Sequence, residues 1–110
     1  MKKSKYKNKK VTYDGIEFDS IKEARRYQEL KLLLRAGAIS DLRLQVPYEL
    51  IPAQYINSKC VERAVKYIAD FVYAKNGKEV VEDAKGVRTD TYKIKKKLML
   101  YVHGIRLKET

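Results

Sequence analysis

The chain of 110 residues has few of the residues from which many catalytic and metal sites are built. It contains one cysteine, Cys60, one histidine, His103, and no tryptophan. A single cysteine excludes an internal disulfide, and neither residue has the neighbours that a cysteine and histidine zinc site needs. A single histidine excludes multi-histidine metal sites and disfavours Ser-His-Asp or Cys-His catalysis. Cys60 is therefore expected to pack as a small apolar residue, and His103, just before Gly104, to end a helix.

Long apolar runs and acidic side chains are also scarce. Without a long apolar run, and with a lysine-rich start that lacks the apolar stretch of a signal peptide, the sequence predicts no membrane association and a cytoplasmic location. The 25 lysines and arginines outnumber the 14 acidic residues and give a net charge of +11. Such an excess on a small domain favours a polyanionic partner, with nucleic acid as the first candidate.

The length predicts one domain with a single hydrophobic core. Residues 1–10 carry six lysines and no apolar periodicity, which is typical of a flexible basic arm. The arm serves either solubility or phosphate contact, and the sequence leaves both roles open. Residues 11–110 form the expected domain.

Two runs rich in β-branched and aromatic residues flank Asn76-Gly77, the strongest short signal for a β-hairpin. The runs are Tyr67–Tyr73 and Glu79–Lys85. A two-residue turn pairs Tyr73 with Val80 and, further along, Asp70 with Asp83. Opposed residues lie about 5 Å apart, where like charges repel, so we expect a cation between these carboxylates. Lys85 shares the face of Asp83 because side chains alternate along a strand.

The alternative interpretation is an exposed, solvated hairpin face on which Lys85 only dilutes the acidic pair. Glu82 lies beside Asp83 but on the opposite face, so it is not expected to share the same metal. A slip of one residue in the register would exchange the roles of Glu82 and Asp83.

A helix is predicted to follow a short hairpin around Asp14-Gly15 and to end at Gly37. Ser20 and Glu23 fit a capping box at its start. Glu23 has two interpretations, because it also lies on the sheet-facing side of the helix. It either bonds the backbone N–H of Ser20 or adds a third acid to the metal site.

The remaining elements follow from periodicity. Alternation over 41–51 predicts a strand, and Pro47 places it at an edge or a bulge. Residues 52–59 are expected to form a connection. Thr89 or Asp90 can cap a second helix that ends at Gly104, and 105–108 alternate as a final strand. The expected apolar stripe of that helix comprises Ile94, Leu98, Tyr101 and Val102.

The second helix also carries a cluster of basic residues. Arg88 lies at its entrance, followed by Lys93, Lys95, Lys96 and Lys97. The short connection from Lys85 predicts that these cations lie near the acidic pair and contact DNA phosphates. The alternative is an ordinary solvated helix face.

These motifs together resemble the PD-(D/E)XK nuclease superfamily, which includes archaeal-type Holliday junction resolvases and many restriction enzymes. They are similar in particular to a family of small phage-encoded proteins of that superfamily, over residues 13–108. The motifs are Phe18-Asp19-Ser20 with Glu23-Ala24-Arg25, Tyr67-x-Ala69-Asp70-Phe71-x-Tyr73, Val81-Glu82-Asp83-x-Lys85-Gly86 and Ile94-Lys95-Lys96-Lys97-Leu98. Ala69 replaces the proline that is common before the first aspartate, and this removes no ligand.

The resemblance implies an α/β fold with a small restriction-endonuclease-like core, in which a mixed sheet has the order helix-strand-strand-strand-helix-strand. It also implies hydrolysis of DNA phosphodiesters with Mg²⁺ or Mn²⁺. Asp70 and Asp83 would hold the metal, Lys85 would orient or activate the attacking water, and Glu23 would support the metal or a water.

The partners implied by the resemblance are DNA and a second copy of the chain. A homodimer making paired cuts suits branched DNA such as Holliday junctions. A phage-encoded protein of this kind would act in the host cytoplasm, during recombination or replication. The rival interpretations are a non-catalytic basic DNA- or RNA-binding phage protein and a structural phage component that binds a protein partner.

Overall fold

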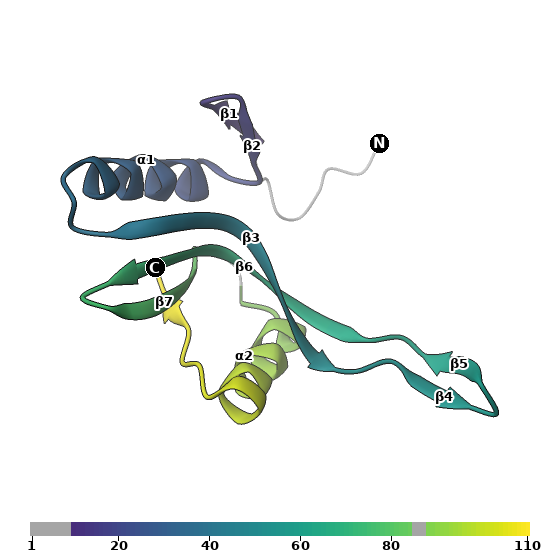
Figure 1. The fold of residues 1–110 in the computed structure, drawn as a ribbon. Coiled ribbons are helices and arrows are strands. Elements are labelled where there is room, and N and C mark those ends of the chain that lie inside the picture. Colours follow the sequence, from purple (N-terminus) through teal and green to yellow (C-terminus); the bar gives the residue numbers. More distant parts are fainter. Residues whose placement is uncertain (1–9, 85–87) are drawn as a thin grey trace, which may run out of the picture.

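A four-stranded mixed sheet with one helix on each face forms the body of the protein in the computed structural model, which describes residues 10–84 and 88–110 (Figure 1). The expected class, a mixed α/β fold, is confirmed. Nine of the ten residues of the predicted basic arm, and also Lys85, lie outside the described residues.

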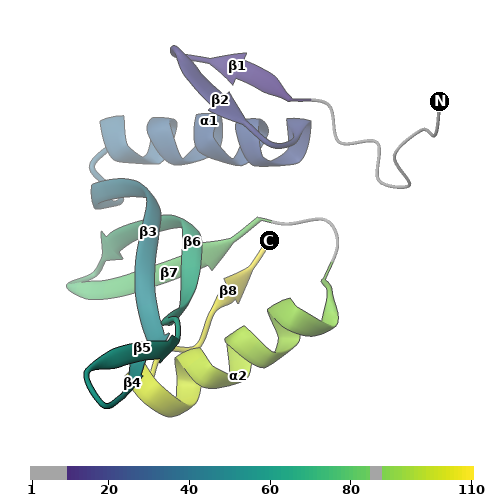
Figure 2. The ribbon, with the colours of Figure 1, turned by 90° about the vertical axis from the view of Figure 1, so that its right-hand side faces the viewer.

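The sheet has the strand order β3-β6-β7-β8. Its strands are β3 (Ser40–Ile51), β6 (Val65–Lys75), β7 (Lys78–Asp83) and β8 (Lys108–Glu109). The pairs β3-β6 and β6-β7 are antiparallel, whereas β7-β8 is parallel. A parallel pair needs a long crossover, and helix α2 (Asp90–His103) provides it. Helix α1 (Ile21–Arg35) lies on the other side of the sheet (Figure 2).

Two buried clusters fill the spaces between the sheet and its helices. Phe71 and Tyr73 of β6 pack with residues of α1, while Val72 and Val81 pack with residues of α2. This division follows from the alternation of side chains along a strand.

The alternation is interrupted at Asp70. Ala69 packs on the α2 side and Phe71 on the α1 side, although strict alternation would give both the same face. The partner strand is irregular at the same point. Leu44 pairs with Phe71 and Val46 with Ala69, so the position of Gln45, which has a φ of 53°, is opposite Asp70. A positive φ is uncommon for a residue other than glycine, and here it marks a local break in β3 beside Asp70.

The central hairpin has the predicted register. Asn76 and Gly77 both have positive φ, as a type I′ turn requires. The pairs run from Lys75 with Lys78 to Phe71 with Glu82, so no slip exchanges Glu82 for Asp83. Pro47 lies on β3, which is an edge of the sheet, as expected.

The helix ends agree with their sequence signals. The Ser20 hydroxyl accepts a hydrogen bond from the backbone N–H of Glu23, and the Thr89 hydroxyl accepts one from Tyr92. Gly104 ends α2 in the left-handed conformation, with a φ of 66°. His103 is the last residue of α2, as predicted.

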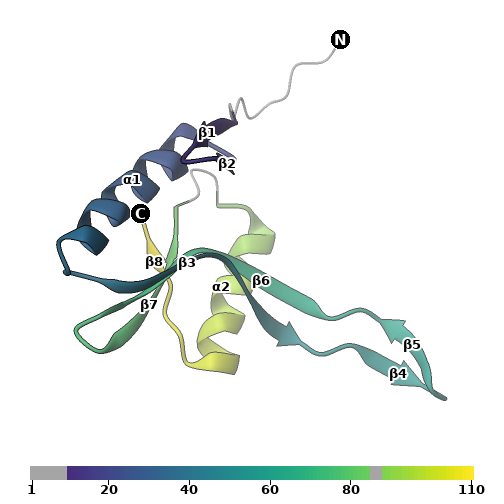
Figure 3. The same ribbon diagram turned by 45° about the horizontal axis from the view of Figure 1, so that its top comes forward.

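Two segments differ from their predictions. Residues 52–59 are not a simple connection, because β4 (Gln54–Ile56) and β5 (Lys59–Glu62) pair as a hairpin that projects from the body (Figure 3). The last strand is Lys108–Glu109 rather than 105–108, since only this segment pairs with the end of β7. The predicted hairpin around Asp14-Gly15 is present as β1 (Val11–Tyr13) and β2 (Ile16–Phe18).

The predicted apolar stripe of α2 is wrong at three of its four positions. Ile94, Tyr101 and Val102 are exposed, whereas Leu98 is partly buried and packs with the buried residues Tyr92 and Met99. Apolar residues occur on both sides of α2, and periodicity alone does not show which side packs. Cys60 is also exposed, because the β4-β5 hairpin has no layer above it to bury the thiol.

Candidate active site

Asp70 lies in the interior at the point where β6 meets the end of β7. Its side chain is only 2% exposed. One carboxylate oxygen, Oδ2, accepts a hydrogen bond of 2.8 Å from the backbone N–H of Ala84. This contact brings the Asp70 carboxylate to the residue that directly follows Asp83.

Asp83 is the last residue of β7 and is equally buried. Its Oδ2 atom accepts a hydrogen bond of 2.7 Å from the Tyr67 hydroxyl. Burial, then the hydrogen bond and negative charge of Asp83, and finally the charge of Asp70, raise the pKa of Tyr67 far above its ordinary value. Tyr67 therefore remains a neutral donor beside both carboxylates.

Glu23 is a third buried acid in this region. Its backbone N–H completes the cap with Ser20, while its carboxylate accepts a hydrogen bond of 3.4 Å from the side-chain amide of Gln45. Gln45 lies opposite Asp70 in the β3-β6 register, so the Glu23 carboxylate contacts the residue of β3 that faces Asp70. Glu23, Asp70 and Asp83 lie on α1, β6 and β7.

The donor set fits a hard cation. Mg²⁺ takes oxygen ligands and commonly uses one or two protein carboxylates, with waters and phosphates completing the shell. Asp70 and Asp83 supply that number. Within residues 10–84 and 88–110, no group of three or more His, Cys, Asp or Glu residues is arranged to hold a metal. The contribution of Glu23 to a metal site therefore stays a prediction.

Glu82 has a different role from Asp83, as the register requires. It is fully buried on the α1 side, where Arg26 donates two hydrogen bonds of 2.8 Å to its carboxylate and the Tyr73 hydroxyl donates one of 3.0 Å. The hydrogen bonds that Arg26 donates to Glu82 raise the pKa of Arg26. This ion pair joins α1 to β7 and leaves Asp83 as the acid on the other face.

Two of the five residues of the basic cluster form ion pairs with an acidic residue of β8. Glu109 in β8 accepts hydrogen bonds from Arg88, Lys96 and the Tyr92 hydroxyl, at 2.7, 2.8 and 2.8 Å. The hydrogen bonds from Lys96, Tyr92 and Arg88 lower the pKa of the Glu109 carboxyl to about 2. Arg88 and Lys96 thus pair with Glu109, and the contact of all five cations with phosphates stays a prediction.

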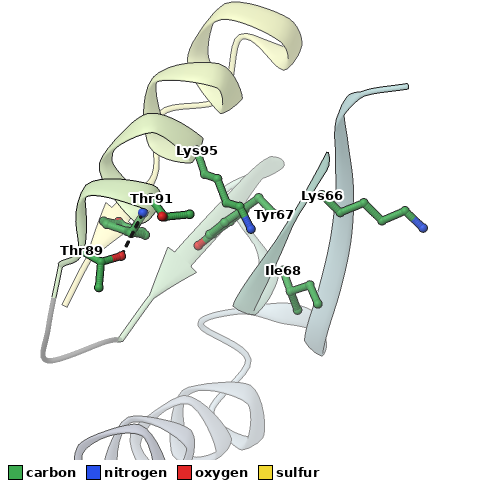
Figure 4. Close-up of a pocket in the computed structure, with 7 residues that line it drawn as sticks. Lys66, Tyr67, Ile68, Thr89, Thr91 and Lys95 are labelled. Carbon is green, nitrogen blue, oxygen red and sulfur yellow. Dashed lines mark hydrogen bonds between the residues drawn. The ribbon is translucent and has the colours of Figure 1, made fainter. Parts of the chain in front are cut away.

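A hollow of about 390 Å³ lies between β6 and the first turns of α2 (Figure 4). Tyr67 forms part of its wall, so the hollow adjoins the hydroxyl that binds Asp83. Lys95 extends from α2 over Tyr67, whereas the Lys66 amine points away from α2. Lys93 and Lys97 line a separate hollow that also contains Glu109.

Sequence reasoning missed Gln45, Tyr67 and Glu109. Tyr67 was part of the motif around Asp70, but alternation gave no reason to connect it with Asp83. Gln45 was one polar position among several in an alternating strand. Glu109 followed the predicted end of the last strand, and nothing local linked it to residues on the second helix.

A protein-family model matches residues 3–108, which is nearly the whole chain. The chain belongs to the DUF1064 family. The family is described as a protein of unknown function. No curated protein and no solved structure matches this DUF1064 chain. In its described part, no helix is both long and apolar enough to cross a membrane.

Proposed function

We propose that this protein is a metal-dependent DNA endonuclease that hydrolyses phosphodiester bonds. The observation that carries the proposal is the burial of Asp70, in the middle of β6, and Asp83, at the end of β7, each bound by a neutral donor, in a chain with a net charge of +11. Burying a carboxylate beside another is unfavourable unless something offsets the repulsion. A divalent cation would do so.

The proposed roles follow from position. Asp70 and Asp83 would hold Mg²⁺ or Mn²⁺. Glu23, which accepts a hydrogen bond from Gln45, would bind a water molecule that is coordinated to the metal. When bound, the metal would act as a Lewis acid on the phosphate and lower the pKa of a water. Tyr67 would fix the orientation of the Asp83 carboxylate. The resemblance to PD-(D/E)XK nucleases assigns Lys85 to the attacking water.

DNA would approach the side of the molecule where α2 begins. Lys93, Lys95 and Lys97 would contact phosphates there. Arg88 and Lys96 would add less positive charge, because Glu109 partly neutralises both. Binding that uses several lysines releases counterions, so affinity should fall steeply with salt.

The finer fold assignment is part of the same proposal. We infer that α1, β3, β6, β7, α2 and β8 correspond to a restriction-endonuclease-like core, because the two acids lie on the central hairpin and one helix covers each face. A homodimer would allow paired cuts, and four-way junctions would match its two-fold symmetry.

The test is a cleavage assay on supercoiled, linear and four-way-junction DNA with Mg²⁺, Mn²⁺ or EDTA. Asp83→Asn should abolish cleavage and preserve DNA binding. Asp41→Asn is the matched control, since Asp41 is exposed and its positive φ is tolerated by asparagine. It should cleave like the unaltered protein.

DNA binding without metal-dependent cleavage by any of these proteins would refute the nuclease proposal. That result would favour the second candidate, a non-catalytic DNA- or RNA-binding protein, for which the net charge of +11 is the supporting observation.

A further inference from the structure

The hollow between β6 and α2 combines an open apolar wall with cations. Ile68 contributes to the wall and is 48% exposed, whereas Tyr67 lines the hollow but is only 3% exposed. Lys95 reaches over Tyr67 from α2 (Figure 4). A solvated phosphate contact would need the lysine but not the apolar wall, so the lining suits a group that has both a flat apolar part and a negative charge.

The described residues that line this hollow differ in charge from those that line the neighbouring hollow beside Glu109. The described residues that line the first hollow include Lys66 and Lys95 and no acid. The neighbouring hollow contains Glu109, which binds Arg88 and Lys96. An anionic ligand is therefore favoured in the first hollow, where Lys95 is the cation nearest the wall.

Size restricts the ligand further. About 390 Å³ is near the lower end of the range for small-molecule pockets, about 300 to 1,000 Å³. That is room for a group the size of one nucleotide, and a duplex cannot enter. Bases of single strands stack on apolar and aromatic side chains without regard to sequence.

We propose that this hollow binds one unpaired nucleotide of the DNA, with its base against Ile68 and its phosphate at Lys95. The inference rests on the proposed nuclease function, because Tyr67 also binds Asp83 and so places the hollow next to the candidate metal site. It defines the substrate class as DNA with an unpaired nucleotide beside the cut, rather than a fully paired duplex or junction.

The test measures binding without chemistry. Two oligonucleotide duplexes, one fully paired and one with a single unpaired 2-aminopurine, are titrated with the protein in EDTA. We expect the unpaired site to bind about 5- to 100-fold more tightly, with a change in 2-aminopurine fluorescence. Lys95→Ala and Ile68→Ala should each reduce this preference. Lys93→Ala, on the same helix but outside the hollow, should weaken both complexes equally.

Equal affinity for the two duplexes would overturn the inference, as would an equal loss for both with Lys95→Ala. Thermal melting of each variant establishes that it is folded. Thr91→Val is a further substitution among the residues that line the hollow. Titration with deoxyadenosine monophosphate and with inorganic phosphate separates a nucleotide site from a phosphate site. Preference without cleavage would refute the nuclease alone, and cleavage without preference would refute this inference alone.

Discussion

Tyr67 and Tyr73 show how two similar side chains on one strand acquire different roles. Each donates a hydrogen bond from β6 to an acid of β7, Tyr67 to Asp83 and Tyr73 to Glu82. Glu82 also has Arg26, whose charge neutralises it inside the core. Asp83 has a neutral donor in Tyr67. The Glu82 pair joins α1 to β7, and the Tyr67 hydroxyl orients the carboxylate of Asp83.

We expect Tyr67→Phe to lower the affinity for Mn²⁺ about 10- to 100-fold, because the hydroxyl that orients Asp83 is lost. The measurement is calorimetric titration of the protein with Mn²⁺. Tyr73→Phe is the matched control. Both substitutions remove a hydrogen bond to a carboxylate and should cost about 1.5 to 3 kcal/mol of the free energy of unfolding, but only Tyr67→Phe should change metal binding. Equal metal affinities would contradict the role of Tyr67.

Arg26→Met should destabilise the protein by about 3 to 5 kcal/mol, because it leaves the buried Glu82 carboxylate with only the Lys108 amine, 3.9 Å away, as a cationic partner. Urea denaturation measures the change. Arg25→Met, at the exposed neighbouring position, should change the free energy of unfolding by about 0.5 kcal/mol or less. Combining Arg26→Met with Glu82→Met should recover most of the loss. A mild effect of Arg26→Met alone would show that the pair is dispensable.

At the scale of elements, α2 is fixed to the sheet by a polar contact as well as by packing. Tyr92 and Met99 bury one side of the helix, and Glu109 in β8 binds Arg88, Lys96 and Tyr92. Both sets of contacts hold the same side of the helix against the sheet. Ile94 and Tyr101 lie outside these contacts and are exposed.

The Glu109 contacts predict a dependence of stability on pH. The folded carboxyl has a pKa of about 2, against an ordinary value of 4.5, so its contribution is fully present above pH 4.5 and disappears as pH falls toward 2. Urea denaturation of the unaltered protein and of Glu109→Gln measures it. The two should differ most above pH 4.5 and converge toward pH 2. A constant difference over this range would refute the assignment.

At the scale of the whole molecule, the β4-β5 hairpin stands apart from the body (Figure 1). All of its strand residues are exposed, and the two strands pair with each other rather than with the main sheet. It contributes nothing to either buried cluster. The stability of the domain therefore resides in α1, α2 and the four-stranded sheet.

Replacing residues 54–63 with Asn-Gly should change the free energy of unfolding by about 1 kcal/mol or less, since the removed segment buries little apolar surface. Thermal and urea denaturation of the shortened protein measure this. Substituting Met99, which is fully buried, with alanine is the positive control and should cost about 2 to 5 kcal/mol. Failure of the shortened protein to fold would show that the hairpin is part of the core.

The sequence by itself determined the local features of this protein. Ser20, Thr89 and Gly104 set helix ends, and Asn76-Gly77 set the register that separates Glu82 from Asp83. These signals are readable because each depends on backbone geometry within a few residues. The two-helix α/β composition follows from them.

Only the tertiary structure decided which residues meet. The contacts of Tyr67 with Asp83, Gln45 with Glu23 and Lys96 with Glu109 join residues 13 or more positions apart. Such contacts depend on strand order and on the rotation of each helix, which local patterns do not fix. The packed face of α2, the burial of Glu82 with Arg26 and the hollow beside Tyr67 all follow from that long-range packing.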